Sequence, residues 1–249
     1  MGQSSITLVV MNGNAAPIAG LLKIAALASL ASAVTTAALI YGPNAAPATG
    51  LEAQARLSGD WTYLYKPWVL FFHPQFAFIA ALGAAAVLLR VRPALVVVGV
   101  FYLTLWAMTE MTQQAYIIDA LNQFWRPGYL GAESAAQQAQ YETLLTGFEA
   151  ISDSQYFVLL FGFGMGSVLL GAAFLSRGKL GKGIGAVTVF LGVVSLTAFT
   201  GYYFGPAAGV TAATGWIYSN LYGPLQTGVR LALAYWLWRE AGRHALAES

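Results

Sequence analysis

The chain has 249 residues, of which 58% are hydrophobic and only 9% are charged, whereas about 25% of a typical soluble domain is charged. It contains no cysteine, which excludes disulfides, thiolate metal sites and cysteine nucleophiles, and its two histidines argue against a multi-histidine metal or haem centre. The net charge of +2, without any run of Lys and Arg, argues against nucleic-acid binding. The composition therefore predicts an all-α integral membrane protein embedded in a lipid bilayer.

Six apolar stretches are long enough to cross the bilayer as helices, which requires roughly 20 residues each. Together they predict a single polytopic membrane domain over residues 1–249, a six-transmembrane-helix bundle with spans at about 17–41, 67–89, 94–118, 155–176, 183–204 and 209–238. Proline or glycine stands near most of their ends, as expected where helices stop.

The basic residues predict the orientation of these spans. Nine of the twelve fall at one side: the loops after the second and fourth spans, the C-terminus, and Lys23 and Arg230, which are expected to extend toward that side. An excess of Lys and Arg marks the cytoplasmic side. Six spans then place both termini in the cytoplasm, and we expect a multi-pass protein of a bacterial-type inner (plasma) membrane.

The first span contains small residues at helical spacing, Ala25, Ser29 and Ala33, and the fourth contains Gly162 and Gly166. Such pairs let helix backbones approach closely in membranes. We expect them to pack helices within the chain, with the first and fourth spans as one candidate pair. A homo-oligomer or a larger membrane complex through Gly162 and Gly166 is the alternative.

The long links lie on the predicted outer side, where eight of the ten acidic residues also map. Within the second of these links, residues 134–153 show a helical pattern, with Leu144, Leu145, Phe148 and Ile151 on one face. This pattern predicts a short amphipathic helix in the outer loop between spans 3 and 4, or a helical extension of span 4.

The third span carries Glu110, the most informative ionisable residue of the chain. At 1.5 Å per residue it lies about 12 Å below the outer end of its span. Trp106, Gln113 and Gln114 share its side of the helix. Because a carboxylate facing lipid is costly, Glu110 is expected to face the bundle interior. It then acts either as an acid/base group or as a hydrogen-bonded link between helices.

The second span places His73 at a depth similar to that of Glu110, so that the two are candidates for acid/base chemistry. A satisfied core histidine is the simpler interpretation. In the sixth span, Pro224 cannot donate a backbone hydrogen bond, and a kink or break is expected there. Polar groups of other spans reach the same outer half and complete the set of candidate ligand-binding residues: Trp106, Gln113, Gln114, Glu149, Asp153, Tyr202, Tyr218 and Asn220.

These observations favour a protein that binds or processes a small lipophilic molecule in a pocket on the outer-leaflet side, with intramembrane carboxylates. A proton- or cation-coupled transporter and a non-catalytic accessory subunit of a membrane complex are the alternatives. The sequence contains no recognised metal-binding motif, although Glu110, Glu149 and Asp153 leave a carboxylate cation site open. No cofactor can be inferred, and whether the protein is an enzyme stays undecided.

Overall fold

The protein is a bundle of long helices. The computed structural model describes residues 15–205 and 211–246, which are helical almost throughout and contain no strand. The long helices are α1 (Ala15–Tyr41), α3 (Trp61–Leu88), α4 (Pro93–Tyr116), α6 (Ala135–Phe174), α7 (Lys179–Phe204) and α9 (Gly223–Leu246). The shorter elements are α2 (Leu51–Arg56), α5 (Arg126–Leu130), α8 (Thr211–Ile217), the 3-10 turn η1 (Leu57–Gly59) and the π-helical segments η2 (Ile117–Trp125) and η3 (Tyr218–Tyr222).

Five of the helices are long and apolar enough to cross a membrane, as in a multi-pass membrane protein. They contain the first five predicted spans, and α6 begins 20 residues before the predicted start at residue 155. The sixth predicted span, 209–238, falls on α8, η3 and α9. It is not among the five because it is interrupted and because α9 carries Arg230, Arg239 and Glu240. Both termini, which were predicted to lie in the cytoplasm, are outside the described residues.

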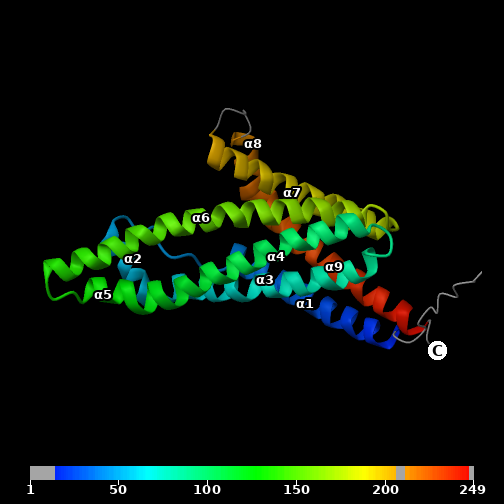
Figure 1. Ribbon diagram of the computed structural model, residues 1–249, viewed down its shortest axis with the longest axis horizontal. Coiled ribbons are helices and arrows are strands. Elements are labelled where there is room, and N and C mark those ends of the chain that lie inside the picture. Colours follow the sequence, from blue (N-terminus) through cyan, green and yellow to red (C-terminus); the bar gives the residue numbers. More distant parts are fainter. Residues whose placement is uncertain (1–14, 206–210, 247–249) are drawn as a thin grey trace, which may run out of the picture.

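The six long helices form a closed ring. Going around it, α1 packs against α3, α3 against α4, α4 against α6, α6 against α7, α7 against α9, and α9 against α1. The common core consists of alanines and leucines with a few large aromatic residues, among them Trp106, Phe174 and Trp236. The first and last helices of the ring, blue and red in Figure 1, run side by side although they are about 200 residues apart in sequence.

Glycines on two sides of α6 allow its close approach to both neighbours. Gly162 lies against the backbone of α4, where an added Cβ would be 3.0 Å from the Tyr102 carbonyl oxygen and 3.1 Å from the Trp106 nitrogen. Gly166 likewise faces Leu103. The expected packing of this pair within the chain is confirmed, but its partner is α4 rather than the first span. The small residues of α1 instead face α3 and α9, where Gly83 abuts Ala25 and the Ser29 hydroxyl bonds to α9.

The outer loop between spans 3 and 4 contains no separate amphipathic helix, contrary to the first of the two predictions. Residues 135–174 form the single helix α6. Ser134 caps its N-terminus, because its side chain accepts a hydrogen bond from the Gln137 amide. The alternative, an extension of span 4, is therefore correct, because no glycine or proline between residues 148 and 161 stops the helix. Of the predicted apolar face, Leu145 and Phe148 are buried, whereas Leu144 and Ile151 are exposed.

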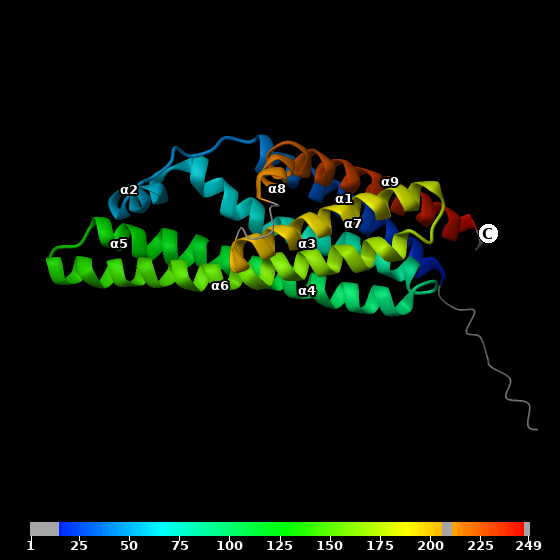
Figure 2. The same cartoon turned by 90° about the horizontal axis from the view of Figure 1, so that it is seen from above.

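The extension of α6 builds a projecting layer at one end of the bundle. Its 40 residues span about 60 Å, twice the roughly 30 Å hydrocarbon core. The segment α4–η2–α5 runs beside it over a similar length, and both project past the remaining helices (Figures 1 and 2). A second, smaller core of Leu121, Leu145 and Phe148 holds the projecting parts together, and α2 packs against α5. Folded structure thus lies beyond the bundle at this end.

The irregularity near Pro224 is a π-helical segment within a helix that continues from residue 211 to 246, where a kink or break was expected. The helix widens into the π-helical segment η3 over Tyr218–Tyr222, directly before Gly223 and Pro224. A π-helical turn is one of the ways in which a helix accommodates a proline ring that would otherwise clash with the carbonyl four residues earlier. The same turn sets the direction in which α9 crosses α1.

The glycine contacts generate a stability prediction. Gly162→Leu and Gly166→Leu should each lower the free energy of unfolding by about 1–3 kcal/mol, because the new side chain would push α4 away from α6. Thermal unfolding of the purified protein in detergent measures this effect. Gly147→Leu is the matched control, since an added Cβ at Gly147 in the same helix meets nothing within 4 Å. Equal melting temperatures for all four proteins would show that these glycines do not determine the packing.

Candidate functional site

Three ionisable side chains from three helices meet in the interior of the ring: His73 of α3, Glu110 of α4 and Arg230 of α9. His73 is 5% exposed and Glu110 7% exposed. Arg230 is half-buried, and its charge attracts a Glu110 carboxylate and repels a protonated His73. No ion pair within about 4 Å joins Arg230 to Glu110 among the described residues. The expectation that Glu110 faces the interior rather than lipid is thus met, and its charged neighbour is an arginine on the last helix. We refer to His73, Glu110 and Arg230 as the polar layer.

Arg230 does not extend toward the cytoplasmic side, contrary to the prediction from sequence. Its guanidinium donates a hydrogen bond to the Ser32 hydroxyl, and its own carbonyl oxygen accepts one from Ser29 at 2.7 Å. The reason is the close contact of α9 with the small-residue side of α1, which offers hydroxyl groups in the interior. The polar stripe Ser29, Ser32, Thr35 and Thr36 in an otherwise apolar helix was the sequence signal for such a partner.

His73 is held by α1 as well. Its Nδ1 lies 2.8 Å from the Thr35 hydroxyl oxygen. Because the single hydroxyl proton of Thr35 is directed to the carbonyl oxygens of Ala31 and Ser32, Thr35 is best placed to accept from a protonated Nδ1. This tautomer leaves the Nε2 lone pair of His73 as a proton acceptor inside the bundle.

Trp106 connects the polar layer to the apolar centre of the ring. Its indole lies one turn before the Glu110 side chain on the same side of α4. Its rings pack edge-on against His73, with centroids 6.4 Å apart, and against Phe163 of α6 at 5.2 Å. Trp106 is 4% exposed. It therefore forms part of the apolar wall of the ring interior, next to the polar layer.

A cavity of about 90 Å³ lies at the centre of the ring, from its middle toward the end where α6 turns into α7. Its walls are almost entirely apolar and include Ala77, Trp106, Phe163 and Phe174. The polar exceptions are Ser167, Thr188, Gln226 and Arg230. Within the described part of the chain, the Nε of Arg230 is buried without a hydrogen-bond partner. Unsatisfied buried donors are rare, so this atom is the most unusual feature of the cavity.

A second pocket, of about 480 Å³, lies in the projecting layer and contains Glu149 and Asp153. Its most buried charged residue is Arg126, which is 8% exposed, donates to Asn122 at 2.7 Å and lies over the ring of Tyr63. We refer to this space as the outer pocket. Sequence reasoning did not identify Arg126, although an arginine followed by proline at the end of an apolar stretch was visible.

The predicted site residues are therefore divided between two places. Trp106 lines the central cavity, and Glu110 and His73 are buried beside Trp106 without lining that cavity. Glu149 and Asp153 line the outer pocket, and Tyr202 donates to Asp153 at 3.3 Å. Gln113 connects the two regions, because its Nε2 donates to the Ser152 hydroxyl at 2.8 Å. Gln114 is buried on α4.

The remaining two predicted residues belong to the π-helical segment η3. Tyr218 stacks on Tyr222, with ring centroids 4.5 Å apart, and Tyr222 in turn bonds to Ser195 of α7 at 2.7 Å. The exposed Asn220 donates to the Trp216 carbonyl of its own helix at 2.8 Å. Tyr218 thus belongs to a contact between α7 and the last helix, whereas the Asn220 side chain bonds to a backbone carbonyl of its own helix.

Metal binding has no support in the geometry. Among residues 15–205 and 211–246, no three His, Asp or Glu side chains are grouped as metal ligands would be. The cation site left open by Glu110, Glu149 and Asp153 therefore has no structural counterpart, because the two outer acids lie in the outer pocket.

No protein-family model, curated protein or solved structure matches this chain. Its function must therefore be argued from the cavities and from the polar layer.

The polar layer generates a prediction on energetic coupling. Glu110→Gln and Arg230→Gln should each lower the free energy of unfolding, because each change leaves an opposite charge buried without its partner. The decrease in the double variant should be about 0.5–3 kcal/mol smaller than the sum of the two single decreases. Unfolding of all four proteins in detergent gives this coupling energy. The pair Glu110→Gln and Arg243→Gln is the control and should be additive, since Arg243 bonds to Glu240. Additivity in both pairs would show that Glu110 and Arg230 do not interact.

Proposed function

We propose that this protein binds a small lipophilic molecule in the central cavity and that the polar layer recognises an anionic or hydrogen-bond-accepting group on it. The observation that carries the proposal is the buried Nε of Arg230, which lacks a partner within the described chain and belongs to a residue lining an apolar cavity. An acceptor such as a carboxylate or carbonyl oxygen would satisfy that N–H. The apolar part of the molecule would contact Trp106, Phe163 and Leu170.

The size of the cavity limits the part of the ligand that can enter. Its volume of about 90 Å³ is below that of an engineered apolar cavity of roughly 150 Å³ that holds a benzene ring. A segment of a flexible acyl chain fits this space better than a ring system, a sterol or another large rigid molecule. Glu110 and the Nε2 of His73 are the proposed acid/base groups if the bound molecule is also transformed.

A binding experiment with 8-bromooctanoate tests this proposal, because bromine quenches tryptophan fluorescence at short range. We expect quenching that is largely lost in the Trp106→Phe variant. Arg230→Gln should weaken binding by about tenfold or more, since hydrogen bonds to charged groups are among the strong ones. Ala77→Leu should also weaken it by filling the cavity. Bromooctanol should bind less tightly than the acid and should be insensitive to Arg230→Gln.

Arg90→Gln serves as the control for loss of one positive charge, because Arg90 is exposed in the turn between α3 and α4. It should bind 8-bromooctanoate as the wild type does. Quenching that is unaffected by both Arg230→Gln and Ala77→Leu would place the probe elsewhere and refute the proposal.

We also propose the full topology of six membrane crossings with both termini in the cytoplasm, with α8, η3 and α9 as the sixth crossing. The closed ring supports it, since α9 packs against α1 and α7 along the same bundle. Because the chain has no cysteine, single cysteines can be introduced without removing others. In intact cells, Gly178→Cys and Ala245→Cys should react only after the membrane is permeabilised, and Gly147→Cys should react with an impermeant reagent added outside. Outside labelling at residue 178 or 245 would contradict the topology.

A proton-coupled transporter is the second candidate function. Two observations favour it: the bond from Gln113 to Ser152, which joins the side of α4 that carries Glu110 to the outer pocket, and the π-helical interruption η3 in the last membrane segment. Interrupted helices at membrane depth are common at transporter binding sites. Ligand movement across the bilayer, which binding alone does not produce, distinguishes this function from the first.

A further inference from the structure

A third pocket, of about 480 Å³, opens at the end of the bundle opposite the projecting layer, where α6 turns into α7 beside the end of α9. Its described lining contains four cationic side chains, Arg177, Lys179, Arg239 and Arg243, and a single acidic one, Glu240. The formal charge of the lining is therefore four minus one, or +3. We refer to this space as the basic pocket.

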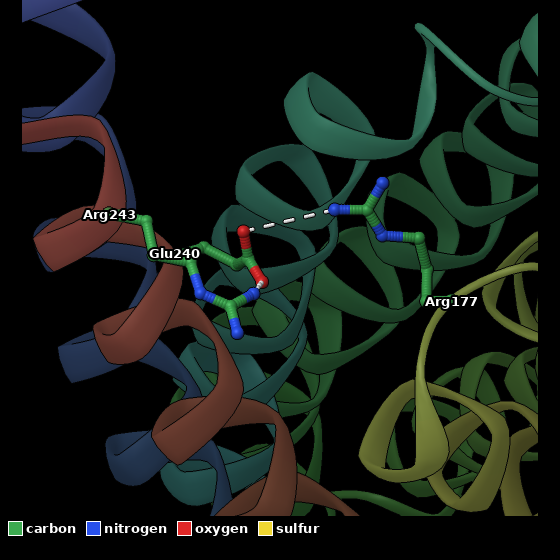
Figure 3. A network of polar contacts seen from close by, with 3 residues as sticks. All are labelled: Arg177, Glu240 and Arg243. Carbon is green, nitrogen blue, oxygen red and sulfur yellow. Dashed lines mark hydrogen bonds and ion pairs between the residues drawn. The ribbon is translucent and has the colours of Figure 1, made fainter. Parts of the chain in front are cut away.

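Glu240 organises the wall of the basic pocket and does not neutralise it. The side chain of Glu240 is 7% exposed and its two carboxylate oxygens face different arginines, as Figure 3 shows. Oε1 accepts a hydrogen bond from Arg243 at 2.6 Å, and Oε2 lies 3.8 Å from Arg177, beyond hydrogen-bond distance. The carboxylate thus positions one guanidinium group from the turn between α6 and α7 and one from α9, and most of their N–H donors stay available.

Backbone donors add to the positive character of the same pocket. Helix α7 starts at Lys179 after Gly178, which offers no side-chain cap. The first hydrogen bond of the helix runs from the Lys182 amide to the Gly178 carbonyl, so the amides of Lys179, Leu180 and Gly181 precede the intrahelical ladder. Both Lys179 and Gly181 line the pocket. The partial positive charge of a helix N-terminus favours an anion at this position.

We infer that the basic pocket binds a phosphate group. The chemistry of its walls matches that ligand, because arginine guanidinium groups bind phosphate oxygens in pairs and lysine supplies a further point charge. Trp236 adds an apolar wall beside the cations. Two sources carry this group: the head group of an anionic phospholipid, which suits a basic pocket at a membrane surface, or a soluble phosphate. This site is independent of the central cavity, and neither proposal requires the other.

The experiment uses the full-length protein purified in the neutral detergent dodecyl maltoside. In one arm, dioleoylphosphatidic acid is added, with dioleoylphosphatidylcholine as the neutral comparison, and bound lipid is counted by native mass spectrometry. In the second arm, inorganic phosphate is titrated and the melting temperature is followed. Retention of the acidic lipid alone identifies a head-group site, and stabilisation by inorganic phosphate identifies a soluble ligand. A lack of response in both arms would refute the inference.

The double variant Lys179→Gln, Arg239→Gln tests the assignment to this pocket, because neither side chain bonds to Glu240 and the wall should stay intact. We expect the affinity of the responding ligand to fall by about tenfold or more, since charge-assisted hydrogen bonds are the strong ones. Arg90→Gln, Arg92→Gln is the matched control: it removes the same charge from the same end of the bundle, outside the pocket. An equal loss of affinity in both double variants would indicate general surface attraction and overturn the assignment.

Discussion

Burial of the Arg230 guanidinium between apolar helices is the constraint on which the arrangement of the ring depends. A charged group removed from water is tolerated only where partners compensate it. Those partners come from two other helices: the Ser32 hydroxyl on α1 accepts a hydrogen bond, and the Glu110 carboxyl group on α4 supplies the opposite charge. The last helix must therefore cross the first at a defined height and rotation, and the irregularity at η3 and Pro224 lies two turns before Arg230, where α9 takes this direction.

The close packing of α6 complements this polar constraint. Gly162 and Gly166 bring α4 to one side of α6, and Gly164, Gly171 and Gly192 bring α7 to the other. In lipid there is little hydrophobic driving force between helices, so such contacts supply much of the association energy. The ring closes around a space that the side chains of α3, α4, α6, α7 and α9 do not fill completely. The central cavity thus results from tight packing at the circumference rather than from loose packing overall.

Three pockets in the described part of the chain differ in character along its length: the outer pocket with acidic residues and Arg126, the central apolar cavity beside the polar layer, and the basic pocket at the opposite end. This order follows the charge distribution that the sequence predicts, with acids on one side and bases on the other. The apolar cavity is thus enclosed between helices, whereas the basic pocket lies at the end of the bundle. The hydrogen bond from Gln113 to Ser152 joins the side of α4 that carries Glu110 to the outer pocket.

The sequence by itself determined the class of protein, the positions of the five apolar helices, the irregularity near Pro224 and the interior position of Glu110. These depend on composition, on stretches of about 20 apolar residues and on the cost of charge in lipid, all of which are local properties. Helix rotation and neighbour choice are not local. Only the tertiary structure decided that Gly162 faces α4, that Glu149 and Asp153 lie apart from the polar layer, and that Arg230 points inward. The position of Arg230 along the chain, near the basic end of its segment, favours an outward direction, whereas its inward direction depends on the serines of a helix about 200 residues away.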